Sequence, residues 1–420
     1  MAARWLAMAG ALLAGGCAGV FQRALPKAPA ACAHLAVGDQ LRVGAAERDI
    51  TPAVGGWLAG FDMARASTGI ASPLKVRALV LLLGDRRFAI VGIDNLGVMR
   101  EDGDWIKAGI VGFANGDVFL CSSHTHAGPD LIGLWGFYLL SSGRDPEYVG
   151  VVRRAVAEAV AEAVAVAAPA QLRLGEGRLP AHGLVKNANR ADCFDRRVVV
   201  LQARACDDER PLGTLLHLAC HPEVLPRRNT EVSSDFVGAL CDGWRAAGHG
   251  QAVFVNGALG AMISPAVKER SQAGAQFLGD AVRAIAETAL ATARALPVDA
   301  IEVRRRDLYV PVHTMGFRLG RLTTVLQREL YDGHARSTVG WLRIGAFEAV
   351  AVPGEMEPAL AEQVRAELRR PDLVVFGLCD DELGYLLRRQ DAEDPEFAYE
   401  RSMSPCLDAG ERVRAALTGQ

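Results

Sequence analysis

The sequence predicts an α/β fold with a mixed β-sheet core flanked by helices, in a single large domain. Short runs of β-branched and other apolar residues alternate along the chain with amphipathic helical stretches. No change of composition divides residues 39–420 into two parts. With 420 residues, of which 50% are hydrophobic and 23% charged, the chain has an ordinary globular composition and can bury a large core.

The expected elements follow from these patterns in chain order. Residues 76–83 and 87–94 are predicted to form a hairpin that turns at Gly84. Residues 146–166 carry valines three or four positions apart, which predicts a helix. Further strands are expected at residues 117–121, 171–174, 197–203, 213–219, 252–255, 302–310, 341–352 and 373–377. Further helices are expected at residues 235–247, with Ser233 or Ser234 as N-cap, at 273–295 and at 357–369.

The first 17 residues differ from the rest of the chain. Arg4 precedes an apolar run over residues 5–16, which is shorter than the roughly 20 residues that span a bilayer. This pattern is typical of a bacterial export signal, and Cys17 stands where a lipoprotein signal would be cleaved and lipidated. A plain signal peptide or a misplaced start remains open, and residues 18–38 are interpreted as a linker. We expect a periplasmic or outer-membrane-anchored lipoprotein, with secretion as the alternative.

The charge and the cysteine content of the chain exclude some classes of protein. The chain carries 46 Lys and Arg against 49 Asp and Glu. It therefore lacks the excess of basic residues that would indicate a nucleic-acid partner. The nine cysteines include no CxxC pair, which excludes a zinc ribbon or thioredoxin motif. Cys121 and Cys220 each end an apolar run, which favours buried free thiols.

Two pairs of histidines stand where strands are expected to end. His124 and His126, in the segment SSHTHAGPD at residues 122–130, are two positions apart and therefore point to one side of an extended chain. His217 and His221 also share a face if their segment is a strand. Imidazoles at strand ends suit metal binding or proton transfer, although hydrogen-bonded structural histidines would give the same pattern.

Two further segments place reactive groups at turns. Glu355 follows a Pro-Gly turn, where its carboxylate can bind a cation or complement a helix dipole. The small residues of segment 256–265 let the backbone approach a ligand, and they suit an ordinary glycine turn equally well. No G-x-S-x-G motif surrounds Ser264, so a serine nucleophile is not indicated.

Together these segments resemble the catalytic N-terminal domain of the neutral, non-lysosomal ceramidases. The resemblance spans nearly all of residues 43–405. It rests on ERDITP at residues 47–52, SSHTHAGPD at 122–130, Asn189-Arg190, Cys220-His221-Pro222, residues 256–265, Pro353-Gly354-Glu355 and the tail from Gly384-Tyr385 to Tyr399-Glu400. Full ceramidases carry an additional C-terminal immunoglobulin-like domain beyond this region.

The resemblance implies one zinc ion per chain, held by two histidines, a glutamate and a tyrosine. Matched by position, the ligands are His124, His221, Glu355 and Tyr385. The resemblance also makes His126 the proton-handling or oxyanion-stabilising histidine, Arg190 a contact to the substrate carbonyl and Tyr399 a second active-site tyrosine, and it matches Ser264 to a serine in the family's G-D-V-S-P loop. Here that loop lacks the aspartate and has one extra residue.

Three functions are compatible with these features. The first is zinc-dependent hydrolysis of the N-acyl amide bond of ceramide-like lipids, giving a sphingoid base and a fatty acid. The second is a zinc hydrolase of the same fold that acts on another N-acyl amide or ester. The third is a non-catalytic exported binding protein, and metal content separates it from the first two. A lipid-like amide substrate and, through a lipidated Cys17, a membrane surface are the expected partners.

Overall fold

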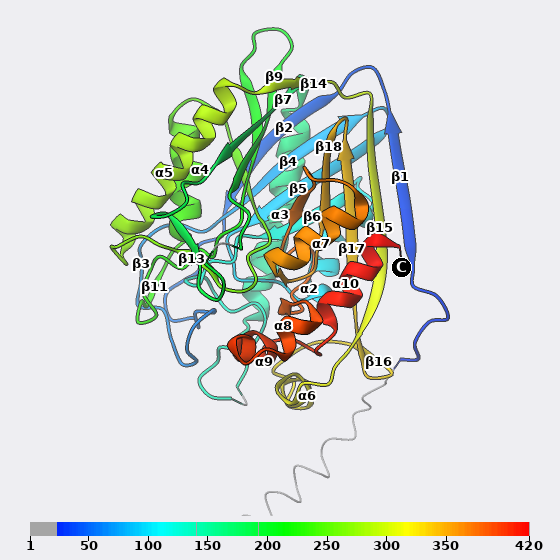
Figure 1. Ribbon diagram of the computed structural model, residues 1–420. Helices are drawn as coiled ribbons and strands as arrows, with labels where there is room; N and C mark the ends of the chain where they lie inside the picture. Colours follow the sequence, from blue (N-terminus) through cyan, green and yellow to red (C-terminus); the bar gives the residue numbers. More distant parts are fainter. Residues whose placement is uncertain (1–22, 140, 192, 420) are drawn as a thin grey trace, which may run out of the picture.

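The computed structural model describes residues 23–139, 141–191 and 193–419. Two β-sheets face each other in the middle of the molecule, and helices cover the outer face of each sheet (Figure 1). The export signal predicted for residues 1–17, including Cys17, lies outside the described residues. Among the described residues, no helix combines the length and apolar character needed to cross a bilayer.

The larger sheet has nine strands and the smaller has six. In the larger sheet the order is β12 (Ala252–Asn256), β10 (Pro211–Leu218), β9 (Arg197–Ala205), β7 (Ala168–Arg178), β2 (Arg42–Asp49), β4 (Lys75–Leu83), β5 (Arg86–Ile93) and β6 (Val118–Ser122), with β14 (Arg294–Leu296) paired to β7. In the smaller sheet the order is β1 (Ala31–Val37), β15 (Ala300–Pro311), β17 (His334–Ile344), β18 (Phe347–Ala351) and β20 (Val374–Phe376), with β16 (Leu330–Tyr331) on β17.

Short elements complete the fold. Three two-stranded pairs are β3 (Gly69–Ile70) with β11 (Glu231–Val232), β8 (Val185–Asn187) with β13 (Ile263–Pro265), and β19 (Glu355–Met356) with β21 (Tyr385–Leu386). The helices are α2 (Arg100–Lys107), α3 (Pro146–Ala165), α4 (Asp235–Ala246), α5 (Gln272–Ala291), α6 (Met315–Leu322), α7 (Pro358–Leu368), α8 (Arg389–Glu393), α9 (Ala398–Ser402) and α10 (Ala409–Thr418), with 3₁₀ turns η1 (Asn115–Asp117) and η2 (Pro395–Phe397).

The sheets are mixed, as the sequence predicts. β10 and β12, β5 and β6, and β18 and β20 pair in parallel, whereas the other neighbours along the two large sheets are antiparallel. The predicted hairpin is β4 and β5, and Gly84 at its turn has a φ of 58°. This left-handed conformation suits glycine because it has no Cβ. The α/β fold class is therefore confirmed.

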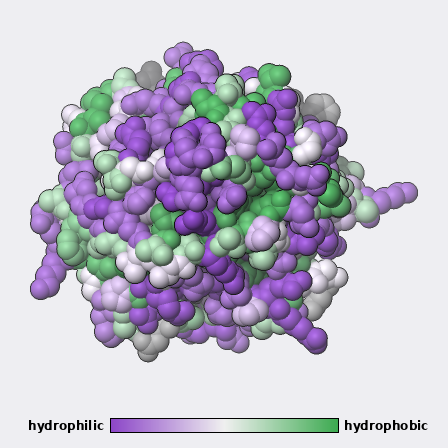
Figure 2. Space-filling view, turned by 90° about the horizontal axis from the view of Figure 1, so that it is seen from above, coloured by the Kyte–Doolittle hydropathy of each residue, from purple (hydrophilic) through white to green (hydrophobic). Residues whose placement is uncertain are grey.

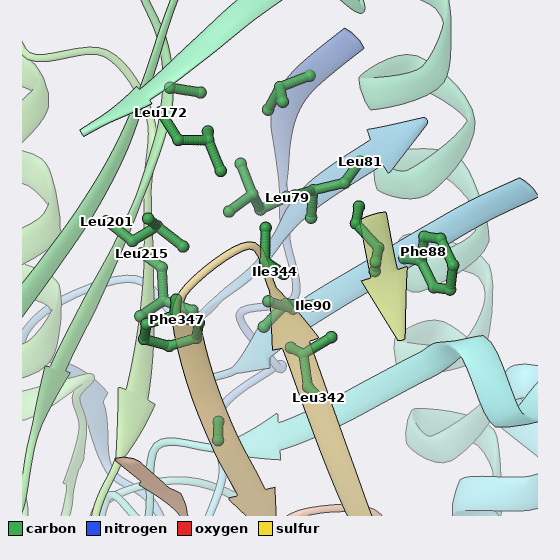
Figure 3. Close-up of a cluster of buried hydrophobic side chains, with 14 of the residues drawn as sticks. Leu79, Leu81, Phe88, Ile90, Leu172, Leu201, Leu215, Leu342, Ile344 and Phe347 are labelled. Carbon is green, nitrogen blue, oxygen red and sulfur yellow. The ribbon is translucent and has the colours of Figure 1, made fainter. Parts of the chain in front are cut away.

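Alternating side chains of each strand build separate cores on its two faces. On β4, Leu79 and Leu81 face the smaller sheet, whereas Val76, Ala78 and Val80 pack under α3. The core between the sheets is drawn in Figure 3, where side chains of β4, β5, β7, β9 and β10 meet those of β17 and β18. Two further cores lie beneath α4 and α5 and beneath α7 and α10. The order of layers is therefore helix, sheet, sheet, helix.

Part of the predicted linker is structured. Residues 31–37, which the sequence assigns to the linker, form β1. All seven residues of β1 pair antiparallel with β15. Most of β1 is exposed, so it contributes few apolar residues to a core and gives a weak sequence pattern. The backbone hydrogen bonds to β15 hold the strand in place, and the linker interpretation is wrong for these residues.

The two sheets meet at one end through β6 and the segment after β20. Cys121 and Cys379 form an isolated antiparallel bridge there. Behind this bridge, the buried carboxylate of Asp380 accepts hydrogen bonds from Lys107 Nζ at 2.6 Å and from Arg305 Nη1 at 2.6 Å. The pKa of Asp380 is lowered to about 2, because these two cations outweigh the opposing effect of burial. This junction fixes the strand ends from which the site is built.

Candidate metal centre

His124 follows the end of β6 in an uncommon backbone conformation. Its φ is 74°, a left-handed value that few residues other than glycine adopt. Its backbone N–H donates to the carbonyl of Asn95, and its ring Nδ1 lies 2.7 Å from the carbonyl oxygen of Leu96. Since a carbonyl only accepts, Nδ1 carries the proton and the lone pair of Nε2 is left for another partner.

His221 is held in the same manner after β10. The carbonyl of Ile263 accepts from its backbone N–H and lies 2.8 Å from its ring Nδ1. Nε2 is 3.0 Å from Glu355 Oε2. Histidines that bind metals commonly donate the other ring N–H to a carbonyl or carboxylate, which fixes the tautomer and the orientation of the ring. His124 and His221 both have this arrangement.

Glu355 faces both imidazoles. It begins β19, where it pairs in parallel register with Tyr385 of β21. Its Oε1 lies 3.6 Å from His124 Nε2. Burial raises the pKa of Glu355, but the two imidazoles and the Tyr385 hydroxyl lower it by more. The net pKa is therefore below the ordinary value. The carboxylate is thus available as an anionic ligand.

His126 joins the same cluster. His124, His126 and His221 each present a ring nitrogen, and these three atoms lie within 4.8 Å of one another. Neither ring nitrogen of His126 has a hydrogen-bond partner, although Glu223 Oε2 is 3.7 Å from Nδ1. Burial, together with the neighbouring imidazoles, lowers the pKa of His126 well below its ordinary value.

The position of His126 is set by close packing. Its ring packs over the backbone of Gly60, where any Cβ would overlap the ring. Phe61 contacts it edge-on, with ring centroids 4.7 Å apart. Arg65 Nη2 donates to the carbonyl of His126 at 2.6 Å. The imidazole is therefore held in place while both of its nitrogens stay free of protein partners.

The donor set fits a metal ion. Two anchored Nε2 atoms face one buried carboxylate, and a third imidazole has unpaired nitrogens in a buried position. Buried polar atoms without partners are rare in proteins, so the two unpaired nitrogens of His126 fit a site that binds a ligand. Imidazole nitrogens and one carboxylate oxygen are the donors that zinc and similar divalent metals prefer.

The two tyrosines lie beside this cluster at different depths. Tyr385 is buried and its ring centroid is 6.1 Å from that of Tyr399, which is half exposed on α9. The Tyr385 hydroxyl donates to Met262 Sδ at 3.4 Å, and it lies close enough to Glu355 for each group to affect the pKa of the other. Burial and then Glu355 raise the pKa of Tyr385 well above its ordinary value, and the same two causes raise the pKa of Tyr399 to about 12. Both phenols therefore keep their protons at neutral pH.

Arg190 and Ser264 are arranged less directly around the cluster. The Arg190 guanidinium donates to the buried carboxylate of Asp391 and lies 5.2 Å from the centre of the Phe397 ring. Ser264 is on β13, which pairs with β8, and the preceding residue, Ile263, holds His221. The structure thus places Ser264 next to the backbone that positions a candidate ligand.

The altered loop before Ser264 folds through an unusual backbone. Ala261 and Met262 have φ values of 60° and 58°, which are left-handed conformations that glycine adopts more readily. A Cβ at Gly260 would overlap the carbonyl of Glu355, so this loop and the candidate ligand pack in direct contact. The loop therefore supports the site mainly through its backbone.

A small apolar cavity opens beside His124 and Glu355. It encloses about 40 Å³. Its other walls are formed by Leu96, Met99, Ile132, Leu134, Trp135, Phe317, Leu326, Glu382, Gly384 and Met403. Burial and then the nearby Glu355 raise the pKa of Glu382 well above its ordinary value. An apolar chain attached to a group at the metal centre can therefore enter here.

Sequence reasoning missed two acidic residues of the site. Glu223 stands two positions after His221, a spacing that places both side chains on one side of an extended segment. Glu382 lies in the loop between β20 and β21 and shows no distinctive local pattern. The first could have been found from its spacing, whereas the second required the fold.

Comparison with known proteins identifies the fold. No family model matches the chain, and no curated protein matches it. Solved structures do match, among them the neutral ceramidase from Pseudomonas aeruginosa, with a TM-score of 0.74 and 17% identity, and a ceramidase complexed with C2, with a TM-score of 0.73 and 16% identity. The matches cover 90% of this chain and, respectively, 74% and 75% of the other chains.

These likenesses show that the chain has the fold of the neutral ceramidase structures, so the resemblance that its motifs indicate is confirmed for the fold.

Proposed function

We propose that this protein is a zinc-dependent amidohydrolase that cleaves the N-acyl amide bond of ceramide-like lipids, with one zinc ion per chain. The convergence of the anchored Nε2 atoms of His124 and His221 on the Glu355 carboxylate carries the proposal. Tyr385, beside Glu355, is the fourth proposed ligand. The likeness to ceramidase structures supports a hydrolase, and the apolar cavity beside the cluster supports a substrate with an aliphatic chain.

A zinc ion bound here would polarise the substrate carbonyl and lower the pKa of water at its open position. His124, His221, Glu355 and Tyr385 would hold the ion. Since both nitrogens of His126 are free of protein partners, its imidazole can hold a proton beside the scissile amide and pass it to the departing amine. The phenol of Tyr399, which is half exposed, can donate a hydrogen bond to the developing oxyanion.

Arg190 acts as a positioning group in this proposal. Its bond to Asp391 fixes the guanidinium at the edge of the site, where it can orient the polar part of the substrate. Ser264 supports His221 through the backbone and is not the nucleophile. A zinc-dependent mechanism therefore predicts that no acyl-enzyme forms at Ser264.

The experiment that tests the function is a metal and substrate assay on the purified protein. We expect about one zinc per chain, activity lost on chelation and restored by zinc, and release of fatty acid from short-chain ceramide dispersed in detergent. Absence of stoichiometric metal would contradict the metal-dependent mechanism and favour a binding protein.

The small size of the apolar cavity favours a second candidate substrate. Its 40 Å³ is close to the volume of one or two water molecules, so a long acyl chain needs the cavity to widen. A hydrolase of this fold that acts on shorter N-acyl amides or esters would fit the cavity as described. A panel of amides and esters with graded acyl length distinguishes the two. Turnover of N-acyl amino acids while every ceramide stays intact would establish the second.

Export is proposed from the sequence alone. The apolar run behind Arg4 supports a cleaved signal, and Cys17 supports lipid attachment. The intact mass of the protein from its native host tests both, because cleavage removes residues 1–16 and lipidation adds acyl chains. An unprocessed Met1 in a cytosolic fraction would contradict export.

A further inference from the structure

Helix α6 presents an apolar face to the outside of the molecule. Met315, Leu319 and Leu322 are 65%, 44% and 75% exposed, and their spacing of four and three positions places them on one side of the helix. The opposite side packs inward, because a Cβ on Gly320 would press on Leu326, a wall of the apolar cavity. The exposed face therefore lies directly over the cavity beside the metal centre.

A neighbouring loop extends this face. Phe137, Tyr138 and Leu139 are 65%, 57% and 69% exposed and follow Trp135, which lines the same cavity. A Cβ on Gly133 would overlap the carbonyl of Val325, so the loop packs directly against the segment after α6.

The helix and the loop that carry these exposed apolar side chains each supply a wall of the cavity, Phe317 and Trp135 respectively. We call these exposed side chains the apolar rim: Met315, Leu319, Leu322, Phe137, Tyr138 and Leu139. Six large apolar side chains gathered around one opening differ from the singly scattered apolar residues of an ordinary surface.

The charge of α6 suits an anionic lipid surface. The only charged residues of its sequence MGFRLGRL are Arg318 and Arg321, and Arg318 is exposed beside the apolar face. A helix with one apolar face flanked by basic residues is typical of segments that lie at a membrane interface. The end of the molecule opposite α6 presents mainly hydrophilic residues, with apolar groups in separate patches (Figure 2).

The start of the described chain lies at the same end as the rim. Arg23 hydrogen-bonds through its backbone to Leu330 and Asp332, in the segment that follows α6 (Figure 1). Cys17 is six positions before Arg23 in the sequence, so a lipid on Cys17 would stand within about 20 Å of this end. An anchor at that position would turn the rim toward the bilayer.

We propose that the apolar rim docks on the surface of a phospholipid bilayer and there admits the acyl chain of an amide lipid to the cavity. The choice of substrate rests on the proposed function, whereas the docking rests on the rim alone. Insertion of Leu319 and Leu322 into the interface would bury apolar surface that now faces water, and the exposed Arg318 would meet anionic headgroups.

The test measures binding of the full chain to vesicles of equimolar phosphatidylcholine and phosphatidylglycerol. Cys17→Ser is the background, so that no lipid anchor contributes. We expect Leu319→Asp/Leu322→Asp to weaken binding by about tenfold or more. Phe277 on α5 is similarly exposed, at 58%, and lies outside the rim. The control variant Phe277→Asp should therefore bind vesicles as tightly as the background protein.

The outcomes separate docking from the proposed function. Docking is supported if the rim variants lose vesicle binding but still hydrolyse a water-soluble short-chain amide at the rate of the background protein. If no amide is hydrolysed while binding still depends on the rim, docking stands and the proposed function fails. Equal vesicle binding by the rim variant and its background would overturn the proposal. The proposal would also be overturned if the background protein is a dimer in the absence of lipid and the rim variant is a monomer, because a second copy of the chain would then cover the rim.

A separate observation concerns Cys121 and Cys379 at the junction of the sheets. Both thiols are buried, and their sulfur atoms are 3.7 Å apart. The Ser122 N–H donates to Leu378 at 3.1 Å and the Asp380 N–H donates to Leu120 at 2.7 Å, on either side of the two cysteines.

These flanking bonds define a non-hydrogen-bonded antiparallel pair. The Cα atoms of such a pair are about 4.5 Å apart, which lies within the 4.4–6.8 Å that disulfides span. Since the backbone already has this spacing, only the two sulfur atoms need to approach each other.

We infer that Cys121 and Cys379 form a disulfide when the chain folds in the presence of a disulfide oxidant such as glutathione disulfide. One cysteine thiolate attacks the oxidant and releases one glutathione thiolate. The second cysteine thiolate then attacks the mixed disulfide and releases the other. Two cysteine thiols are oxidised and one glutathione disulfide is reduced to two thiols. Because both cysteines are buried in the finished fold, exchange takes place before the sheets close.

Peptide mapping after refolding in glutathione buffer tests this inference. We expect two fewer alkylated cysteines than in the reduced chain and a linked peptide containing Cys121 and Cys379. Cys379→Ser should abolish that peptide, whereas Cys241→Ser, at another buried thiol, should keep it. Full alkylation of all nine cysteines after oxidative refolding would overturn the inference.

Discussion

The metal centre and the apolar rim are neighbours built on different principles. In the centre, backbone carbonyls fix the rings of His124 and His221, and these rings and Glu355 are buried. The rim consists of the eight-residue helix α6 and a loop whose large side chains face outward. The proposed chemistry therefore depends on strand ends held by the sheets, whereas the proposed access of substrate depends on a thin surface layer.

The largest effect is expected at the ligands of the centre. His221→Ala removes one candidate ligand nitrogen, the one that lies 3.0 Å from Glu355 Oε2. We expect metal content to fall from about one ion to almost none, and turnover to fall by roughly 10⁴ or more. Metal analysis and initial rates check this, with His182→Ala at an exposed histidine as control. Stoichiometric zinc in the variant would exclude His221 as a ligand.

His126→Ala separates proton transfer from metal binding. If His126 handles protons, metal content should be unchanged while turnover falls by roughly 10² to 10⁴. Zinc titration of the variant decides this. A parallel loss of metal would instead make His126 a third imidazole ligand, which the clustering of the three rings also permits.

Asp380→Asn tests the junction behind the centre. The amide cannot neutralise Lys107 and Arg305, so two buried cations lose their counter-ion and the free energy of unfolding should fall by about 3–5 kcal/mol. Urea unfolding at pH 7 measures it. The matched change Glu393→Gln, in an exposed pair with Arg389, should shift stability by less than about 1 kcal/mol. Equal effects would show that the buried ion pairs of the junction stabilise the fold no more than an exposed ion pair does.

His217 predicts how stability depends on pH. Burial lowers its pKa to about 4 from the ordinary 6.5, with the opposing effect of Asp195 too small to compensate. As the pH falls, the unfolded chain therefore binds this proton first. The contribution of neutral His217 is complete above pH 6.5 and declines by about 3 kcal/mol between pH 6.5 and 4.

Unfolding curves across that range, compared with His217→Gln, isolate this contribution. The variant should lose less stability on acidification than the parent protein does. Identical pH slopes for the two proteins would show that His217 titrates normally in the folded state.

The smallest effect is expected for Ser264→Ala. Since Ser264 supports His221 through the backbone, turnover should fall by at most about tenfold, against roughly 10⁴ or more for loss of a nucleophile. Rates of the variant and mass spectra of the wild type during turnover measure this. A trapped acyl-Ser264 species would reverse the assignment.

The sequence predicted the parts of the site whose signal is local. His124 and His221 stand at the ends of apolar runs, and Glu355 follows a Pro-Gly turn, so each could be placed at a strand end from its neighbours alone. The structure brings the three together at hydrogen-bonding or near hydrogen-bonding distances. The hairpin of β4 and β5 was equally accessible, because alternation and a turn glycine define it within one short segment.

The rest depends on partners that are distant in sequence. β1 was assigned to a linker because its strand character comes from pairing with β15, far along the chain. The proximity of Cys121 to Cys379 joins residues 258 positions apart. Glu382 is buried beside Glu355 only after the two sheets have met. No local pattern encodes such contacts.

The pairing of β19 with β21 has a consequence for biosynthesis. It joins Glu355 to Tyr385, while His124 is translated more than two hundred residues earlier. Until Tyr385 has left the ribosome, the early imidazoles lack part of the proposed ligand set. The proposed metal site can therefore form only after the chain has been made as far as Tyr385, and a nascent chain truncated before Glu355 is expected to bind the ion weakly.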